Sequence, residues 1–237
     1  TNITCFGAND GTITISGAAG GAGTHEFTIN GGIGWQASPV FSSLIPGSYN
    51  VQMRDAVNPT CILTLNGALL LTQPAILNAT LVKTDVNCFG ANNGSIVISA
   101  PTGGYGTYGY SINGGATWQG SGNFTNLSLA TYDVRIRDAV NTACTITLNA
   151  ALIVTQPVIL SATVTKSDVT CFGNTDGTIT VSAPAGGHGT FEYSINGGGS
   201  WQALGTYTAL APGTYNVQIR DAAFTGCYRV LNAALVI

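Results

Sequence analysis

Three copies of one sequence block, repeated at a constant period of 83 residues, constrain the fold more than any other feature. Each copy carries two cysteines and one tryptophan. The first cysteines are Cys5, Cys88 and Cys171; the second cysteines are Cys61, Cys144 and Cys227; the tryptophans are Trp35, Trp118 and Trp201. Self-similarity at a fixed period indicates a repeated structural unit. A unit of this length can hold a small sandwich core, so we expect three small domains in tandem.

Short alternating segments indicate that each unit is built from strands. Residues 12–16 alternate polar and apolar side chains, and residues 95–99 and 178–182 repeat the pattern. This is the period of a half-buried strand, whereas no stretch shows helical caps or a useful helical period. Turn signals recur about every eight to twelve residues. The sequence therefore predicts an all-β fold: a tandem array of three immunoglobulin-like antiparallel β-sandwich domains.

Glycine positions suggest where the strands are joined. We expect Gly11, Gly94 and Gly177, which follow an Asn or Asp in a turn, to adopt positive φ. Asn30-Gly31 and its counterparts at 113–114 and 196–197 predict a tight hairpin. A returning strand is then expected to carry Trp35 and Gln36.

The Thr-Gln-Pro segments are the best domain boundaries, because proline cannot donate to a β-ladder. They divide the chain into repeats at 1–73, 74–156 and 157–237. Residues 76–86 and 159–169 look like the opening strand of the domain that follows. On this division the first domain lacks its opening strand. Either the chain is a slice of a longer array, or a preceding copy supplies that strand.

Composition argues against two classes of partner. Only 7% of residues are charged and the net charge is −3, so there is no basic field for nucleic acid. The few Lys and Arg residues are scattered, and apolar runs such as 68–71 are too short to span a bilayer. We expect neither nucleic-acid binding nor membrane insertion.

The six cysteines, two per unit at constant spacing, indicate disulfides in an oxidising compartment. Pairing within each unit uses every cysteine, joining Cys5 to Cys61, Cys88 to Cys144 and Cys171 to Cys227. Pairing across a linker, as between Cys61 and Cys88, would leave Cys5 and Cys227 unpaired. The alternative without any disulfide is a set of reduced thiols in the core. We predict the pairing within units.

The order of motifs resembles a known family. Each unit runs through Cys-Phe-Gly, an Asn-Gly or Asp-Gly turn, Ile-Asn-Gly-Gly, Trp-Gln, Tyr-x-Val, Arg-Asp-Ala and Cys, and two units end in Thr-Gln-Pro. This order is similar to the SprB-type repeats of Bacteroidetes gliding-motility adhesins, over essentially the whole chain. In the second unit, Ala130-Thr131 replaces the Pro-Gly of the pattern. The resemblance implies a long, repetitive cell-surface protein, exported by type IX secretion and acting in attachment or gliding motility, without enzyme activity.

The tryptophans are candidate ligand-stacking residues. One indole per domain at Trp35, Trp118 and Trp201, each followed by Gln, could form a row of platforms for sugars. The alternative, which we favour, is that each ring packs over the core near the disulfide, since large aromatic side chains dominate the cores of small domains.

Three aspartates, Asp55, Asp138 and Asp221, recur after an arginine where a strand turns into a loop. A calcium site would need several oxygen ligands together. Asp10 and Asp176 could contribute, but the second unit has Asn93 at that position. We favour an aspartate that bonds loop amides in an Asx-type turn, with calcium as the only possible cofactor.

The chain offers no recurring catalytic set. His25 and His188 are not at equivalent positions, so we expect no enzyme activity and no catalytic residues. Two main hypotheses remain. The chain is an extracellular adhesin stalk that binds surface or substratum glycans through many weak contacts, or it belongs to a self-assembling filament in which residues 72–83 and low-charge faces contact other copies of the chain. A weaker third hypothesis is a carbohydrate-binding module that uses the tryptophans.

Overall fold

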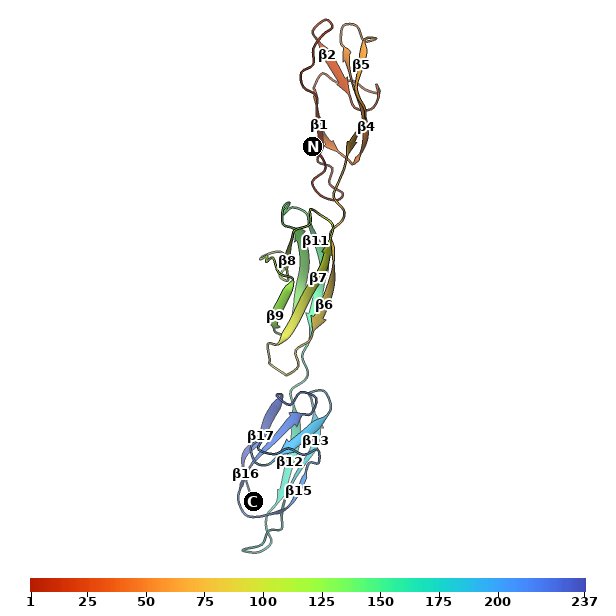
Figure 1. Cartoon of the computed structure of the whole chain (residues 1–237). Coiled ribbons are helices and arrows are strands. Elements are labelled where there is room, and N and C mark those ends of the chain that lie inside the picture. The colour runs from red at the N-terminus through yellow and green to blue at the C-terminus, as the bar shows by residue number, and fades with distance from the viewer. The chain divides into compact units, whose positions relative to one another are not determined.

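The computed structural model describes all 237 residues and contains strands but no helices (Figure 1). No segment forms a helix long and apolar enough to cross a membrane. The first repeat contains β1 (Gly11–Thr14), β2 (His25–Thr28), β3 (Val40–Leu44), β4 (Gly47–Asp55) and β5 (Ile62–Leu71). The second contains β6 (Asn78–Thr84), β7 (Gly94–Thr102), β8 (Tyr108–Ser111), β9 (Asn123–Leu127), β10 (Ala130–Asp138) and β11 (Thr145–Val154). The third contains β12 (Ser161–Ser167), β13 (Gly177–Ala185), β14 (Phe191–Ser194), β15 (Thr206–Leu210), β16 (Thr214–Asp221) and β17 (Tyr228–Val236).

Each of the last two repeats folds into two three-stranded sheets. In the second repeat the strand orders are β6-β7-β9 and β11-β10-β8, and in the third they are β12-β13-β15 and β14-β16-β17. The pairings are antiparallel. In immunoglobulin nomenclature these sheets correspond to A-B-E and G-F-C. The predicted all-β fold, a tandem array of immunoglobulin-like sandwiches, is confirmed.

The first repeat differs in one sheet. Its β2-β4-β5 sheet matches the others, but β1 pairs only with β3. No strand equivalent to β6 lies beside β1. As a consequence β1 ends at Thr14, whereas β7 and β13 each continue for nine residues alongside β6 and β12.

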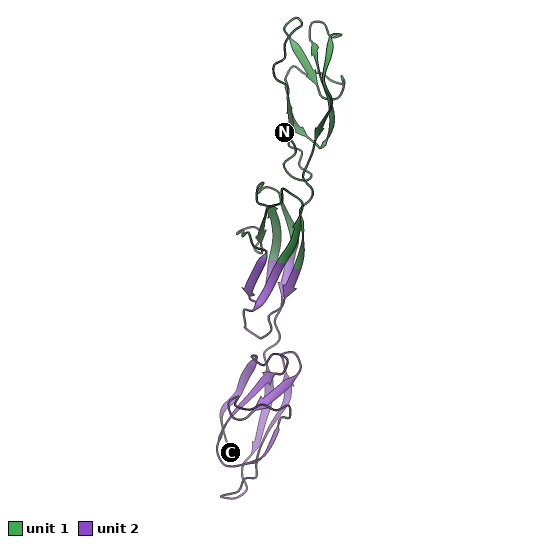
Figure 2. Cartoon of the chain, in the orientation of Figure 1, with its two compact units in different colours: residues 1–81, 98–122, 133–150 green, residues 82–97, 123–132, 151–237 purple.

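The chain divides into two compact units (Figure 2). One unit comprises residues 1–81, 98–122 and 133–150, and the other comprises residues 82–97, 123–132 and 151–237. Each unit combines a terminal repeat with part of the middle repeat.

The core of each sandwich comes from the alternating residues of the central strands. In the third repeat Ile179 and Val181 of β13 pack with Val217 and Ile219 of β16, and all four are buried. In the first repeat Ile13 and Val51 occupy the equivalent places. The period-two pattern of the sequence thus puts one face of each sheet in the core.

A tyrosine at the start of each long central strand fixes the preceding turn. The hydroxyl groups of Tyr49, Tyr132 and Tyr215 donate to the carbonyl oxygens of residues 45, 128 and 211 at 2.7, 3.0 and 2.8 Å. A tyrosine that bonds the backbone just upstream is a hallmark of immunoglobulin-like sandwiches. In the second repeat the bond forms although Ala130-Thr131 replaces Pro-Gly.

Gly11, Gly94 and Gly177, the first residues of β1, β7 and β13, do not adopt positive φ, contrary to expectation. A Cβ on Gly11 would lie 2.8 Å from Leu71, one on Gly94 2.9 Å from Val154, and one on Gly177 2.7 Å from Ile237. Close packing against the last strand therefore excludes a side chain here.

The Asn-Gly glycines turn the chain, but the predicted tight hairpin and its returning strand do not form. Gly31, Gly114 and Gly197 have φ values of 70°, 71° and 70°. After the turn, Gln36 makes only a single antiparallel bridge to Phe27. β2 instead pairs with β4, since the residues around Trp35 turn away after this bridge.

Candidate functional site at the repeat joints

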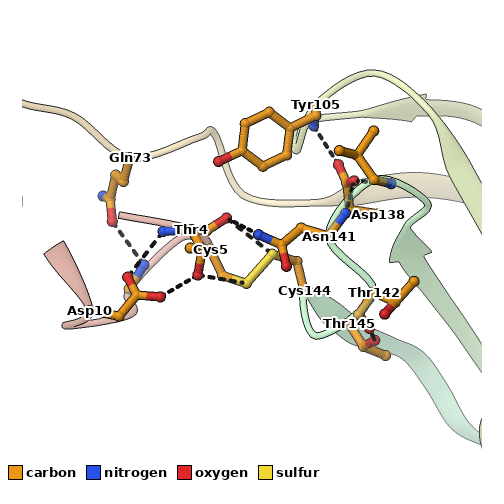
Figure 3. Close-up of a disulfide and its surroundings, with 12 residues drawn as sticks. Thr4, Cys5, Asp10, Gln73, Tyr105, Asp138, Asn141, Thr142, Cys144 and Thr145 are labelled. Atoms are coloured by element: carbon orange, nitrogen blue, oxygen red, sulfur yellow. Dashed lines mark hydrogen bonds between the residues drawn. A yellow bond between two sulfur atoms is a disulfide. The ribbon is translucent and has the colours of Figure 1, made fainter. Parts of the chain in front are cut away.

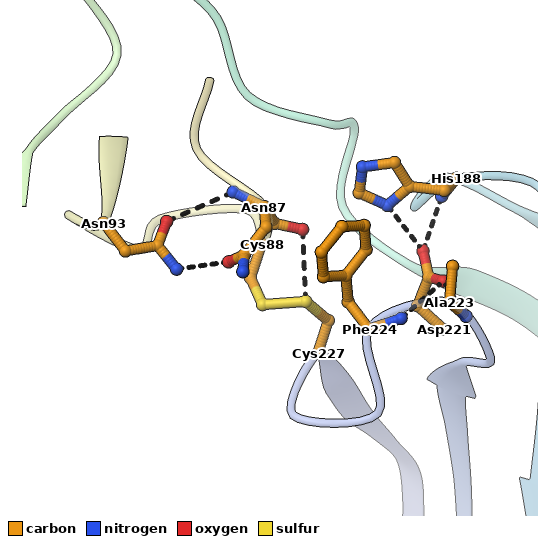
Figure 4. Close-up of polar contacts among 8 residues, drawn as sticks. All are labelled: Asn87, Cys88, Asn93, His188, Asp221, Ala223, Phe224 and Cys227. Atoms are coloured by element: carbon orange, nitrogen blue, oxygen red, sulfur yellow. Dashed lines mark hydrogen bonds and ion pairs between the residues drawn. A yellow bond between two sulfur atoms is a disulfide. The ribbon is translucent and has the colours of Figure 1, made fainter. Parts of the chain in front are cut away.

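The disulfides join consecutive repeats. Cys5 is bonded to Cys144 and Cys88 is bonded to Cys227, each pair separated by 139 residues, with Cα–Cα distances of 5.3 Å (Figures 3 and 4). The predicted pairs within units, Cys5–Cys61, Cys88–Cys144 and Cys171–Cys227, are therefore wrong. Cys61 and Cys171 are free and exposed, so neither takes part in a disulfide within this chain.

Strand geometry explains why the two cysteines of one repeat cannot meet. Gly94, close after Cys88, pairs with Leu127, just before β10 begins. Cys144 lies past the other end of β10, where its carbonyl oxygen accepts a bond from Asp138 N at 2.9 Å. A nine-residue strand spans about 30 Å, far beyond the Cα separation of a disulfide. The two cysteines of a repeat thus lie at opposite ends of its sandwich.

A polar side chain braces each loop that carries a first cysteine. Asp10 Oδ1 accepts a bond from Thr4 N at 3.0 Å, and its Oδ2 accepts one from the Thr4 hydroxyl (Figure 3). Asn93 Oδ1 likewise accepts from Asn87 N at 3.1 Å, but here the second bond is reversed, because Asn93 Nδ2 donates to Asn87 Oδ1 (Figure 4). The hydrogen bonds from the Thr4 side chain and backbone lower the pKa of Asp10. The residue before the turn glycine therefore orients the cysteine loop.

The linker glutamines also hold these loops. Gly7 N donates to Gln73 Oε1 at 2.8 Å, and Gly90 N donates to Gln156 Oε1 at 2.9 Å. Across the first disulfide, Asn141 Nδ2 donates to Thr4 O at 3.4 Å (Figure 3). From the sequence, the Gln-Pro pairs indicated only domain boundaries, and the bonds that Gln73 and Gln156 make to the cysteine loops were missed, although Gln recurs before Pro in the sequence.

A buried aspartate organises each loop that carries a second cysteine. Asp138 Oδ1 accepts bonds from the backbone N–H groups of Val140 and Asn141 at 2.7 and 2.8 Å, and its Oδ2 accepts one from Tyr105 N (Figure 3). Burial raises the pKa of Asp138, but these three amide donors outweigh it and the net pKa is lowered. The ionised carboxylate thereby ties the cysteine loop to the glycine-rich loop.

The other two aspartates make equivalent bonds. Asp55 accepts from the N–H groups of residues 22, 57 and 58, and Asp221 accepts from those of residues 188, 223 and 224. The His188 ring also bonds Asp221 at 2.9 Å and packs against Phe224 with the two ring planes tilted by 44° (Figure 4). These bonds match the Asx-type role. No group of three or more His, Cys, Asp or Glu residues gathers as a metal site, and calcium binding stays a prediction.

Glycines in the loop opposite each aspartate are sterically required. A Cβ on Gly103 would overlap the carbonyl oxygen of Ile76, and one on Gly104 would overlap the Asp138 carboxylate. Both residues have positive φ. The glycine pair thus lets the backbone of this loop approach both Ile76, in the segment before β6, and the Asp138 carboxylate.

The tryptophans stack on arginines on the outer faces of the G-F-C sheets. The guanidinium carbons of Arg54, Arg137 and Arg220 lie 4.6, 4.5 and 4.5 Å from the indole centroids of Trp35, Trp118 and Trp201. Each indole is half-buried, and Trp201 is absent from the core cluster of its repeat. The rings therefore do not pack over the core as expected.

Charge at these tryptophans differs between repeats. Arg54 is paired with Glu26 at 2.6 Å and Arg220 with Glu192 at 2.7 Å. In the second repeat Gly109 lies opposite Arg137, whose buried Nε has no partner. A pocket of ≈ 310 Å³ lies beside Trp201, between the Asn-Gly turn and the loop before β17.

Pockets also lie at both disulfides. One of ≈ 440 Å³ is lined by residues of the first Cys-Phe-Gly loop, the Pro74–Leu77 segment and residues 143–146. A smaller one of ≈ 130 Å³ occupies the equivalent place at Cys88–Cys227. The walls of both pockets are largely apolar and surround a disulfide.

Comparison with known proteins supports one family. The SprB repeat model matches residues 1–34, 80–117 and 163–200, which contain the first cysteine and the Asn-Gly turn of each copy. None of the curated proteins matches the chain. The SprB repeat is a structural repeat typical of cell-surface proteins and not an enzyme family. Together with the tandem sandwiches, these three matches show that the chain contains three SprB repeats.

Proposed function

We propose that this chain is a stalk segment of an extracellular cell-surface adhesin and that it transmits tension. Three observations support the proposal: the SprB repeats, the tandem sandwiches and the disulfides between consecutive repeats. Disulfides persist in oxidising environments outside the cytosol. Roles in attachment or gliding motility and export by type IX secretion come from the family resemblance and belong to the same proposal.

The Cys5–Cys144 bond carries this proposal, because it changes what happens when a domain unfolds under tension. With both disulfides intact, the shortest covalent route from Cys5 to Cys227 follows the backbone only between Cys144 and Cys88, about 56 residues or ~200 Å when extended. Without them the route covers about 222 residues, or ~780 Å. The disulfides therefore keep an unfolded stalk short.

Force spectroscopy tests this role. The chain is pulled from its two ends, oxidised and then in the presence of a reductant. We expect the contour length of the fully unfolded chain to increase about threefold on reduction, because the covalent path then follows the whole backbone and no longer passes through the two disulfides. The Cys61→Ser variant is a control that should behave like the unchanged chain. Equal contour lengths with and without reductant would refute the mechanical role.

A second candidate is carbohydrate binding, and the pocket beside Trp201 favours it. The half-exposed indole offers a face for a sugar ring, while Arg220 covers its other side. A glycan array with the unchanged chain and the Trp201→Ala variant tests this function. Loss of a bound glycan would support it, and unchanged binding would remove the tryptophan from consideration.

A further inference from the structure

The two unpaired cysteines occupy positions that are bonded elsewhere in the same chain. Cys61 corresponds to Cys144 and Cys227, which are both bonded to a first cysteine 139 residues earlier. Cys171 corresponds to Cys5 and Cys88, which are both bonded to a second cysteine 139 residues later. Within residues 1–237 no cysteine lies 139 residues before Cys61 or 139 residues after Cys171. We propose that they bond each other between copies, so that Cys171 of one chain pairs with Cys61 of a second copy, head to tail.

Cys61 is presented by the same backbone turn as its bonded counterparts. Cys61 N donates to Asn58 O at 2.9 Å, and Cys144 N donates to Asn141 O at 2.9 Å. Cys61 O accepts from Asp55 N at 3.2 Å, and Cys144 O accepts from Asp138 N at 2.9 Å. The thiol is therefore already held in the conformation that the disulfide requires at the other joints.

The loop of Cys171 is likewise preformed. Asn174 N donates to Cys171 O at 3.1 Å, as Ala8 N does to Cys5 O at 3.0 Å. Asp176 accepts bonds from the backbone N–H and the hydroxyl of Thr170 at 3.0 and 2.5 Å. The same brace orients the loops of Cys5 and Cys88. Because the loop is already ordered, binding a partner costs little conformational entropy, which favours the association.

The side chains next to both thiols are uncovered. Phe172 is fully exposed, whereas Phe6 and Phe89 at the bonded joints are each 53% exposed. Near Cys61, Leu63 is 58% exposed, whereas its counterpart Ile146 is half-buried. A pocket of ≈ 230 Å³ lies beside Cys61 and is lined by Gly20, Gly21, His25, Asp55 and Leu63, among others. This open face corresponds to the one that receives a Cys-Phe-Gly loop at Cys144.

The reaction is an ordinary thiol oxidation. Both S–H bonds are lost as the bond between Cys61 Sγ and Cys171 Sγ forms. Two electrons and two protons pass to a low-molecular-weight disulfide, which is cleaved into two thiols. Head-to-tail pairing uses two different surfaces of one chain, and such heterologous contacts propagate into open assemblies.

Bonding at every joint would change the mechanics of an array. The backbone between Cys61 and Cys88, like that between Cys144 and Cys171, is about 27 residues, or ~95 Å when extended. Each such segment connects a disulfide from the repeat before with a disulfide to the repeat after. Within one copy, the shortest covalent route from Cys61 to Cys171 runs back to Cys5, crosses the disulfide to Cys144 and continues to Cys171, about 83 residues or ~290 Å when extended. The backbone alone covers about 110 residues, or ~385 Å. A series of copies bonded in this way therefore lengthens less on unfolding than the backbone alone would allow.

Mixing two single variants tests the proposal directly. The Cys61→Ser variant keeps only the Cys171 thiol, and the Cys171→Ser variant keeps only the Cys61 thiol. Each is oxidised in a glutathione redox buffer, alone and as an equimolar mixture, and separated by non-reducing electrophoresis. We expect about tenfold more covalent dimer in the mixture than in either variant alone, and peptide mapping should find the Cys171–Cys61 bond.

A displaced thiol controls for simple exposure. Thr60→Cys added to the Cys61→Ser and Cys171→Ser changes moves the thiol by one residue within the same exposed loop. This variant should not form the mixed dimer with Cys61→Ser. The proposal is overturned if the displaced thiol pairs equally well, if symmetric dimers of the unmixed variants are as abundant as the mixed dimer, or if the mixture forms no dimer. Because the readout is a covalent bond between copies, its failure would leave the tensile role of the two existing disulfides intact.

Discussion

Cys144 and Cys61 occupy the same position in two copies of one sequence, yet Cys144 is buried in a disulfide and Cys61 is a free, exposed thiol. The turn that holds each cysteine is the same. The two positions differ in the residues that surround the cysteine. At Cys144 the pocket is lined by the Cys-Phe-Gly loop of the first repeat and by the segment from Pro74 to Leu77. At Cys61 the pocket has no counterpart of either segment. The comparison shows that the turn around the second cysteine forms within a single repeat, whereas the residues that cover it come from the preceding repeat and the linker.

Thiol labelling should show the largest difference between the two positions. In the monomer, under native, non-reducing conditions, we expect an alkylating reagent to add to Cys61 and Cys171 and to leave the other four cysteines unmodified, because those four are in disulfides. Mass spectrometry of the intact chain and of its peptides would count and locate the additions. Modification of Cys144 before reduction would contradict the assigned joint.

Serine substitution should separate the positions by several kcal/mol. Cys144→Ser opens the loop closed by the Cys5–Cys144 bond, and the chain-entropy model gives a loss of about 3 to 5 kcal/mol for a loop of this size. Cys61→Ser removes only an exposed thiol and should leave stability unchanged. Chemical denaturation of both variants measures the difference. Equal stabilities would mean that the disulfide does not constrain the unfolded chain.

Alanine at two equivalent glycines should give the next largest difference. Gly20 and Gly103 have φ values of 92° and 80°, so alanine is strained at both. A Cβ on Gly103 would overlap the Ile76 carbonyl oxygen, whereas a Cβ on Gly20 meets nothing within 4 Å. We expect Gly103→Ala to cost about 2 kcal/mol more than Gly20→Ala, as overpacking usually does. Thermal unfolding of the pair checks this, and identical losses would contradict close packing of the opening segment.

Asparagine at the two aspartates should give the smallest difference. Asp138→Asn turns an NH₂ group or an uncharged oxygen toward three amide donors in a buried site, at a cost of about 1 to 2 kcal/mol. We expect a smaller loss for Asp55→Asn, because the open pocket beside Asp55 lets water replace a lost bond.

The pH dependence of Asp138→Asn gives a second readout. The pKa of Asp138 is lowered from 3.8 in the folded state, so its contribution is complete above the unfolded value and is lost as pH falls through the folded value. The stability gap between the unchanged chain and the variant should therefore be constant above about pH 5 and should close below about pH 4. A gap that persists at low pH would show that charge is not its cause.

Local patterns in the sequence predicted the sandwich because they reflect contacts within one repeat. The alternation around Ile13 and Ile96 places these residues in the core, and Asp138 forms the expected Asx-type bonds. The cysteine partners could not be predicted in this way. Spacing within a unit is compatible with several pairings, and the choice depends on the distance along β10 between the two ends of a sandwich.

The tryptophans show the same limit. A recurring Trp followed by Gln indicates a structural position but not which face of a sheet it covers. In the structure the arginine of β4, β10 or β16 points outward, since the residue directly before it, Met53, Ile136 or Ile219, is buried in the core. The indole packs on the arginine guanidinium group and therefore lies on the same outer face.

The sequence by itself determined the three-fold repetition, the all-β sandwich and the family, because these depend on period, alternation and turn residues that are local along the chain. Only the tertiary structure decided that Cys5 bonds Cys144 and that Cys61 and Cys171 have no partner within this chain. A disulfide requires two Cα atoms within a few ångströms, and that proximity arises where one sandwich ends and the next begins.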